Sequence, residues 1–92
     1  MITLCMIARV PLAGVDAFAR YEAAVLPRLA AYGGELQQRL RNADGTIEIH
    51  VVRFASDAEL AGFRVDPVRL ASAPLLALSG AIIEIVDVAP VA

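Results

Sequence analysis

The 92-residue sequence predicts a single α+β domain, residues 1–92, in which a strand–helix–strand unit occurs twice. Each half of the chain contains an apolar segment, then apolar residues at helical spacing, then a second strand-like segment, and a polar turn at Asn42–Gly45 separates the halves. Hydrophobic residues make up 59% of the chain, which is more than a core of this size can bury. We therefore expect the protein to self-associate.

The first unit runs from the N-terminus to the polar turn. Ile2–Val10 is almost entirely apolar, which is typical of a central strand with two buried faces. Apolar residues then recur at helical spacing over Val15–Tyr32, where Pro27 should bend the helix and Gly33–Gly34 should end it. The alternation that follows predicts a strand at the sheet edge with one wet face. In this segment Leu36, Gln38 and Leu40 alternate with Gln37, Arg39 and Arg41.

The second unit follows the turn. Ile47–Phe54 alternates two sets of residues, neither of them cleanly polar, so we expect both faces of this strand to be covered. A capping box over Ser56–Glu59 opens a second helix, and Asp66–Pro67 restarts it. Residues 68–78 are apolar on nearly all sides, which predicts that this helix contacts more than its own sheet. Residues 81–88 form the last strand.

Charge and residue counts exclude several classes of function. The net charge is −2, with eight arginines and no lysine spread without a basic cluster, so nucleic acid is not an expected partner. Cys5 and His50 are the only residues of their kinds, too few for an ordinary zinc site, and we expect no metal and no cofactor. No apolar run reaches the length of a membrane span, about 18 residues, and no signal peptide is visible. These observations favour a cytoplasmic protein.

The order of the elements predicts how they pack. A β-α-β-β-α-β order with right-handed crossovers gives a four-stranded antiparallel sheet with both helices on one face, the ferredoxin-like arrangement. The other face of the sheet is then uncovered. Because the strands are apolar on both faces, we expect a second copy of the chain to cover that face, sheet against sheet. The expected assembly is a homodimeric α/β barrel.

Five stretches of the sequence match a known family. They are Tyr21-Glu22, Leu26-Pro27, Tyr32-Gly33-Gly34, Val52-Arg53-Phe54-Ala55-Ser56 and Asp66-Pro67. Because of these stretches, the chain resembles the dimeric α/β-barrel superfamily. The resemblance extends over nearly its whole length. It is most similar to the small uncharacterised bacterial members with a domain of unknown function and to the NIPSNAP-like members.

The resemblance implies a range of activities. The superfamily includes cofactor-free monooxygenases, haem-degrading enzymes, small isomerases, stress-responsive barrels and members with no assigned activity. The branches that degrade haem or form quinones typically use a Trp together with Asn and His or Tyr. This chain has no Trp, and its only asparagine, Asn42, lies in the turn. The resemblance therefore favours the uncharacterised bacterial branch.

Two polar residues are candidates for acid–base chemistry. Glu22 falls inside the apolar stripe of the first helix, between Phe18 and Leu29, so its carboxylate should face the sheet. There it is either a structural carboxylate paired with an Arg or Tyr, or a general acid or base with a raised pKa. His50 shares a strand face with Phe54, which we expect to be the helix side. It is either a hydrogen-bonded core residue or the partner of Glu22 in an acid–base pair.

A second group of polar residues could bind a ligand. Strand alternation can place Arg9, Arg39, Arg53 and Glu84 on the open face of the sheet, where the arginines would bind a carboxylate or a phenol through bidentate bonds. The alternative role of these residues is in salt bridges between subunits, to Glu84 or Glu48. Tyr21 lies on the inner stripe of the first helix, either as a packing residue or as a ligand contact. Cys5 is expected to be a small buried thiol.

Three classes of function are compatible with the sequence. The first is a homodimeric barrel without enzymatic activity, which could be linked to stress, and the lack of the usual catalytic residue types favours it. The second is a small-ligand binder, or a cofactor-free enzyme of monooxygenase or isomerase type, acting on an apolar or aromatic acid. The third is an accessory barrel that binds another protein through the apolar helix over Leu70–Leu78.

Overall fold

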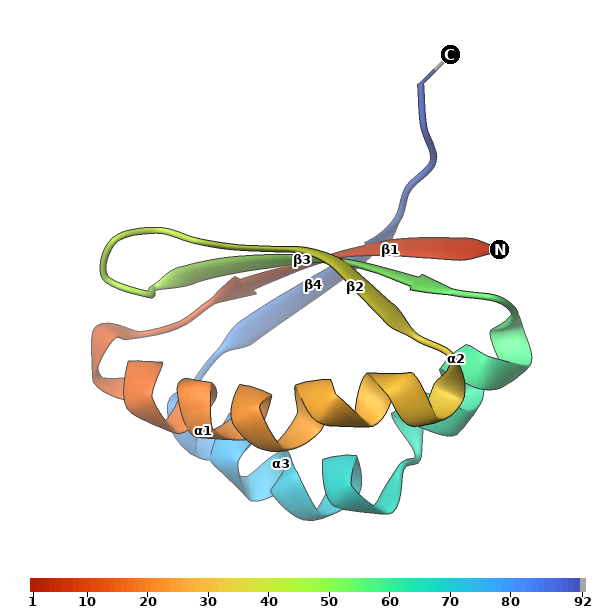
Figure 1. Cartoon of the computed structure of the whole chain (residues 1–92). Helices are drawn as coiled ribbons and strands as arrows, with labels where there is room; N and C mark the ends of the chain where they lie inside the picture. The colour runs from red at the N-terminus through yellow and green to blue at the C-terminus, as the bar shows by residue number, and fades with distance from the viewer. Residues whose placement is uncertain (92) are drawn as a thin grey trace.

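The computed structural model describes residues 1–91, which form one sheet with a layer of helices on one of its faces (Figure 1). The sheet is antiparallel with strand order β2-β3-β1-β4, and the predicted ferredoxin-like arrangement is confirmed. The strands are β1 (Ile2–Arg9), β2 (Glu35–Arg41), β3 (Ile47–Phe54) and β4 (Ile82–Asp87). The helices are α1 (Val15–Val25), α2 (Asp57–Arg64) and α3 (Pro67–Ser79), with short 3-10 segments η1 (Leu12–Gly14) and η2 (Leu26–Tyr32).

The first helix changes its geometry where the sequence predicts a bend. The α-helical part ends at Val25, and a 3-10 segment with Pro27 in its first turn continues to Tyr32. Proline has no backbone N–H, so it cannot donate the bond that an α-helix needs there. Gly33 adopts a left-handed conformation with φ of 66° and ends the segment, as predicted.

The two predicted helix caps are confirmed. The Ser56 hydroxyl accepts a hydrogen bond from the Glu59 backbone N–H at 3.3 Å, at the start of α2. The Asp66 carboxylate accepts from the backbone N–H groups of Val68 and Arg69 at 3.0 and 3.1 Å, at the start of α3. α3 packs along α1, so the helical layer is two helices wide (Figure 1).

The core lies between the helices and the sheet. One cluster contains Leu4, Leu29, Val52, Phe54 and Leu60, and a second contains Ala8, Val10 and Phe18. The helix-facing residues of β3 are Glu48, His50, Val52 and Phe54, all of them buried. The opposite face of β3 is only half-buried or exposed, so within one chain only the helix-facing side of this strand is covered.

The register of β2 corrects one prediction. β2 is an edge strand, as expected, but its pairing with β3 shifts between Leu36 and Gln38, leaving Gln37 as a bulge. Arg39 is consequently paired with His50 and lies on the helix-facing side of the sheet, not on its open face. A bulge inserts one residue, and an inserted residue exchanges the two faces for every side chain beyond it.

The open face of the sheet is largely apolar. Arg9, Arg53 and Glu84 lie on this face, as the alternation predicts. Exposed aliphatic residues accompany them on three of the four strands, β2, β3 and β4: Leu40, Ile47, Ile82 and Val86. Leu70 and Leu78 of α3 are also exposed, on the helical layer. Among the described residues, no helix has the length and apolar character needed to cross a membrane.

Candidate functional site

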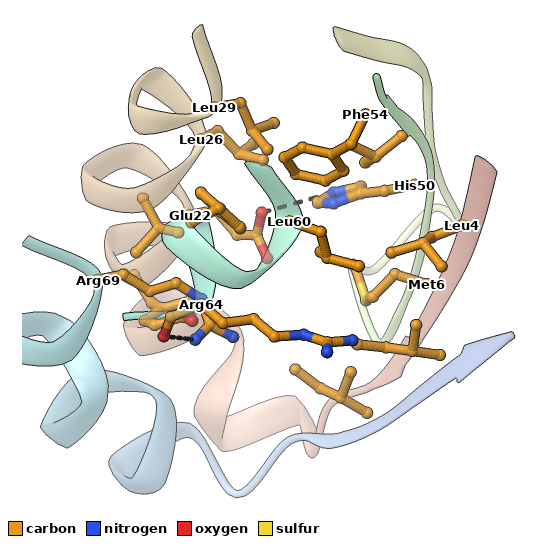
Figure 2. Close-up of a pocket in the computed structure, with 16 residues that line it drawn as sticks. Leu4, Met6, Glu22, Leu26, Leu29, His50, Phe54, Leu60, Arg64 and Arg69 are labelled. Atoms are coloured by element: carbon orange, nitrogen blue, oxygen red, sulfur yellow. Dashed lines mark hydrogen bonds and ion pairs between the residues drawn. The ribbon is translucent and has the colours of Figure 1, made fainter. Parts of the chain in front are cut away.

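A cavity of about 120 Å³ lies between the helices and the sheet (Figure 2). Most of its lining is aliphatic or aromatic and comes from β1, α1, η2, β3, α2 and β4. Its polar lining residues are Tyr21, Glu22, His50, Arg64 and Arg69. An apolar cavity with a few convergent polar groups is the arrangement expected of a small-molecule site.

Glu22 is the carboxylate of this cavity. It is 4% exposed on the sheet-facing side of α1, as its place in the apolar stripe predicts. Figure 2 shows its carboxylate pointing toward His50, whose Nε2 atom lies 3.5 Å from Glu22 Oε2. This is the one polar contact of the Glu22 carboxylate among residues 1–91. Burial, and then the negative charge of Glu48, raise the pKa of Glu22 from its ordinary value near 4.5 to about 7.

His50 connects Glu22 to a second carboxylate. It stands opposite Met6 of β1 in the register, which points its ring into the helix-facing layer. Its Nε2 atom is in close contact with Glu48 Oε2 as well as facing Glu22. Burial lowers the pKa of His50, although the Glu48 carboxylate works in the opposite direction. The neutral imidazole, donating Nε2–H to Glu48, is therefore the favoured form at neutral pH.

Glu48 is held as an anion by two arginines. It is 1% exposed and accepts hydrogen bonds from Arg39 Nε at 3.2 Å and Arg41 Nε at 2.9 Å. Burial raises its pKa, but the hydrogen bonds from His50 and Arg41 outweigh burial, so the pKa of Glu48 lies below its ordinary value. From the sequence alone, the role predicted for Glu48 is a salt bridge between subunits. The signal that could have found Glu48 is its two-residue spacing from His50, which puts both side chains on one strand face.

The structure divides the predicted site residues into two groups on opposite faces of the sheet. Glu22, His50 and Tyr21 border the cavity, whereas Arg9 and Glu84 form an exposed ion pair at 3.6 Å on the open face. Arg53 is also on the open face, where its guanidinium contacts the sulfur of Met1. A ligand in the cavity therefore cannot reach the residues of the open face.

Arg39 has neither of the roles predicted for it, which were ligand binding on the open face and a salt bridge between subunits. Because of the β2 bulge, it lies behind His50 and pairs with Glu48. It acts on the cavity only through charge: together with Arg41 it lowers the pKa of both Glu22 and His50, as the smaller causes in each case.

Two arginines that sequence reasoning missed line the cavity. Arg64 is in the last turn of α2 and Arg69 is in the first turn of α3. Arg69 is close enough to Tyr21 to lower the pKa of the phenol, although burial dominates and raises that pKa overall. The sequence feature that could have predicted their place is the helix break at Asp66–Pro67. The two arginines flank this break, and both line the same cavity.

The acidic cluster could also hold a cation. Glu22, Glu48 and His50 each offer one ligand atom, and these atoms lie within 4.8 Å of one another. Carboxylates with an imidazole suit a divalent transition-metal ion. Arg39 and Arg41, however, already bind the two oxygens of Glu48, so a cation would have to displace guanidinium hydrogen bonds and accept two nearby positive charges.

Comparison with known proteins identifies the fold. No protein-family model matches the chain, and no curated protein matches its sequence. A proposed antibiotic biosynthesis monooxygenase of Nitrosomonas europaea superposes with a TM-score of 0.75 at 15% identity, covering 94% of this chain and 96% of that one. The protein Rv0793 of Mycobacterium tuberculosis gives 0.74 at 21% identity, covering 100% and 97%.

A third solved structure is an uncharacterised NIPSNAP domain protein of Burkholderia xenovorans. Its TM-score is 0.68 at 15% identity, covering 100% of this chain and 96% of that one. The chain thus shares the ferredoxin-like fold of the antibiotic biosynthesis monooxygenase-like and NIPSNAP proteins, and the resemblance expected from the sequence is confirmed for the fold.

Proposed function

We propose that this protein catalyses cofactor-independent proton transfer on a small, largely apolar acid bound in the cavity between the helices and the sheet. The observation that carries the proposal is the position of Glu22, a buried carboxylate that borders an apolar cavity and has His50 as its single polar contact among residues 1–91. A carboxylate in such a place can exchange a proton with a bound molecule near neutral pH, because neither ionisation state is strongly favoured.

The proposed step is an isomerisation. The Glu22 carboxylate removes a proton from a carbon next to a carbonyl group, which leaves an enolate and a neutral Glu22 carboxyl. The same proton then returns to a different atom of the enolate, so that no oxidant, reductant or second substrate is consumed. His50 is a positioning residue in this step: its Nε2–H is donated to the ionised Glu48, and the ring held in this way is the polar neighbour of the Glu22 carboxyl, 3.5 Å away.

A monooxygenase activity is the second candidate, and the fold shared with proposed antibiotic biosynthesis monooxygenases favours it. The first step would be the same proton removal, followed by addition of molecular oxygen to the carbanion. The resulting peroxide takes back the proton from Glu22 and loses water, which leaves a carbonyl group on a carbon that began as CH2. Oxygen consumption that depends on added substrate distinguishes this candidate from the isomerisation.

We further propose that the protein is a homodimer formed through the open face of the sheet. This face exposes aliphatic side chains on β2, β3 and β4, including Leu40, Ile47 and Ile82. Apolar surface of this extent on a small domain favours association. A stress-linked role of the assembly, and binding of another protein through exposed Leu70 and Leu78 of α3, stay as predictions of the sequence.

The proton-transfer proposal is tested with 3-methyl-2-oxobutanoate in deuterium oxide, by following the loss of the C3 proton signal in NMR spectra. Wild-type protein should accelerate the exchange, and Glu22→Gln should reduce it by about 100-fold or more, because general-base catalysis supplies about that factor. Arg20→Gln, which changes an exposed arginine of α1, is the matched control. Exchange that is absent from the wild type across a series of short 2-oxo acids, or unchanged in Glu22→Gln, contradicts the proposal.

A further inference from the structure

We infer that the ligand of this cavity is a short apolar monocarboxylate, whose carboxylate is bound by Arg64 and Arg69 and whose apolar body extends to Glu22. The inference rests on the proposed function in taking the cavity as the reaction site, and it adds the class and the orientation of the substrate.

Arg64 and Arg69 line the cavity and have no acidic partner among residues 1–91. Arg28 pairs with Asp66, and Arg39 and Arg41 pair with Glu48. Among residues 1–91, none of the ion pairs includes Arg64 or Arg69. Both residues nevertheless line the cavity, Arg69 half-buried and Arg64 exposed, and among residues 1–91 neither forms an ion pair with Glu22, the carboxylate of the same cavity.

Neutral groups hold Arg69 in place. Its Nη1 donates a hydrogen bond to the Arg64 backbone carbonyl at 2.9 Å, and its guanidinium carbon lies 5.5 Å from the centre of the Phe63 ring. The Tyr21 hydroxyl is also within hydrogen-bonding reach of the Arg69 side chain. These contacts order the side chain while leaving its charge free to bind an anion, and a planar guanidinium suits a carboxylate through paired hydrogen bonds.

The charges that line the cavity set the orientation of the ligand. Figure 2 shows Arg64 and Arg69 on one side of the cavity, with Glu22 and His50 between them and the apolar residues Leu29 and Phe54. A ligand carboxylate is attracted to the arginine side and repelled by the ionised Glu22. The apolar carbons of the ligand are therefore the atoms presented to Glu22, which is where a proton would be removed.

The volume of the cavity limits the ligand to a short one. It measures about 120 Å³. A dry apolar cavity of about 150 Å³ holds one benzene molecule, so this cavity admits a body of about four or five carbon atoms. A branched group of that size fits against Leu4, Met6 and Leu60, whereas a long acyl chain does not.

The test compares isovalerate with its neutral analogue isovaleramide, using isothermal titration calorimetry and NMR spectra of the full chain. The two probes have the same shape and differ in charge. Isovalerate should bind the wild type, and Arg69→Gln and Arg64→Gln should each weaken it by about tenfold, the effect of losing a charge-assisted hydrogen bond. Isovaleramide binding should change less than about twofold. Arg69→Lys, which keeps the charge, should recover part of the affinity, and Arg20→Gln should bind like the wild type.

Selective loss of isovalerate binding in the glutamine variants, with circular dichroism confirming that they fold, supports the inference. Four results would overturn it: no isovalerate binding by the wild type, equal weakening of both probes, unchanged isovalerate binding in the variants, or wild-type spectra that respond only at Arg9 and Arg53 on the open face. Decanoate binding as strongly as isovalerate would also overturn it. Glu22→Gln separates this inference from the proposed function, because that variant should lose proton exchange yet keep, or strengthen, its binding of isovalerate.

Discussion

The helical layer of this protein buries two carboxylates in opposite ways. Asp66 is fully buried between η2 and α3 and accepts hydrogen bonds from Arg28, the Tyr32 hydroxyl and two backbone N–H groups. Glu22 is almost as deeply buried on α1, but its carboxylate has one polar contact, to His50 at 3.5 Å. The hydrogen bonds from Arg28 and Tyr32 hold the pKa of Asp66 well below its ordinary range, whereas burial raises that of Glu22 to about 7.

The difference shows that burial alone does not make a carboxylate reactive. A buried carboxylate with enough donors stays ionised and fastens structural elements together, as Asp66 does for η2 and α3. A buried carboxylate with too few donors stays close to its protonation midpoint near neutral pH and can exchange a proton. The count of donors therefore separates the structural carboxylate from the candidate catalytic one.

The largest expected effect is on stability at high pH. Because the pKa of Glu22 is about 7 in the folded state and near 4.5 in the unfolded chain, the folded state holds the extra proton between those values. Wild-type stability should therefore fall as pH rises through this range, relative to Glu22→Gln, which cannot ionise. Above pH 7 the variant should be more stable by up to about 3 kcal/mol, and below pH 4.5 the difference should disappear.

Urea unfolding at pH 4, 6 and 8 measures that difference. Glu35→Gln, which removes an exposed carboxylate of β2, serves as the control for the loss of one negative charge. A difference between wild type and Glu22→Gln that stays constant across the three pH values would show that folding leaves the pKa of Glu22 unchanged. Wild-type stability that instead rises relative to Glu22→Gln between pH 4 and 6 would show that Glu22 is paired in the way Asp66 is.

The reciprocal substitution tests Asp66. Asp66→Asn keeps a good helix cap but replaces a charged acceptor with an amide whose N–H₂ group faces the Arg28 guanidinium. We expect the melting temperature to fall by about 10 °C, because charge-assisted hydrogen bonds to Arg28 and Tyr32 are lost. Thermal unfolding followed by circular dichroism checks this, with the exposed Asp57→Asn as control. Equal melting temperatures for the two variants would remove the structural role assigned to Asp66.

A smaller effect should appear within the cavity cluster. The negative charge of Glu48 is one of the causes that raise the pKa of Glu22, second to burial. Glu48→Gln should therefore move the pKa of Glu22 downward from about 7, and NMR titration of the labelled carboxyl carbon measures the change. Glu59→Gln, which alters a capping residue of α2, is the control. An unchanged titration of Glu22 in Glu48→Gln would mean that burial alone sets its pKa.

The smallest effect is expected at the surface. Arg9 and Glu84 form an ion pair at 3.6 Å with side chains that are 60% and 56% exposed. Glu84→Gln should change the free energy of unfolding by less than about 0.5 kcal/mol, because solvent screens such pairs. Chemical unfolding at low protein concentration measures it. A larger effect that grows with protein concentration would place the pair in the proposed dimer interface.

The residues that sequence reasoning located are those governed by local periodicity. The helical stripe of α1 predicts that Glu22 faces the sheet, and the alternation of β3 places His50 on the helix side, so their meeting could be foreseen. The cap at Asp66 is a local signal of the same kind. The bulge at Gln37 has no comparable signal, and it places Arg39 beside Glu48 instead of on the open face.

The sequence by itself determined the order of the elements, their caps and the inward direction of Glu22 and His50, because each depends on spacing within a few residues. Only the tertiary structure decided that Glu48 joins this pair and that Arg64 and Arg69 line the same cavity. Glu48 shares β3 with His50, but its distance from Glu22 depends on how α1 packs on the sheet, and the place of Arg64 and Arg69 depends on the break between α2 and α3. The charges that surround Glu22 are therefore set by packing between elements.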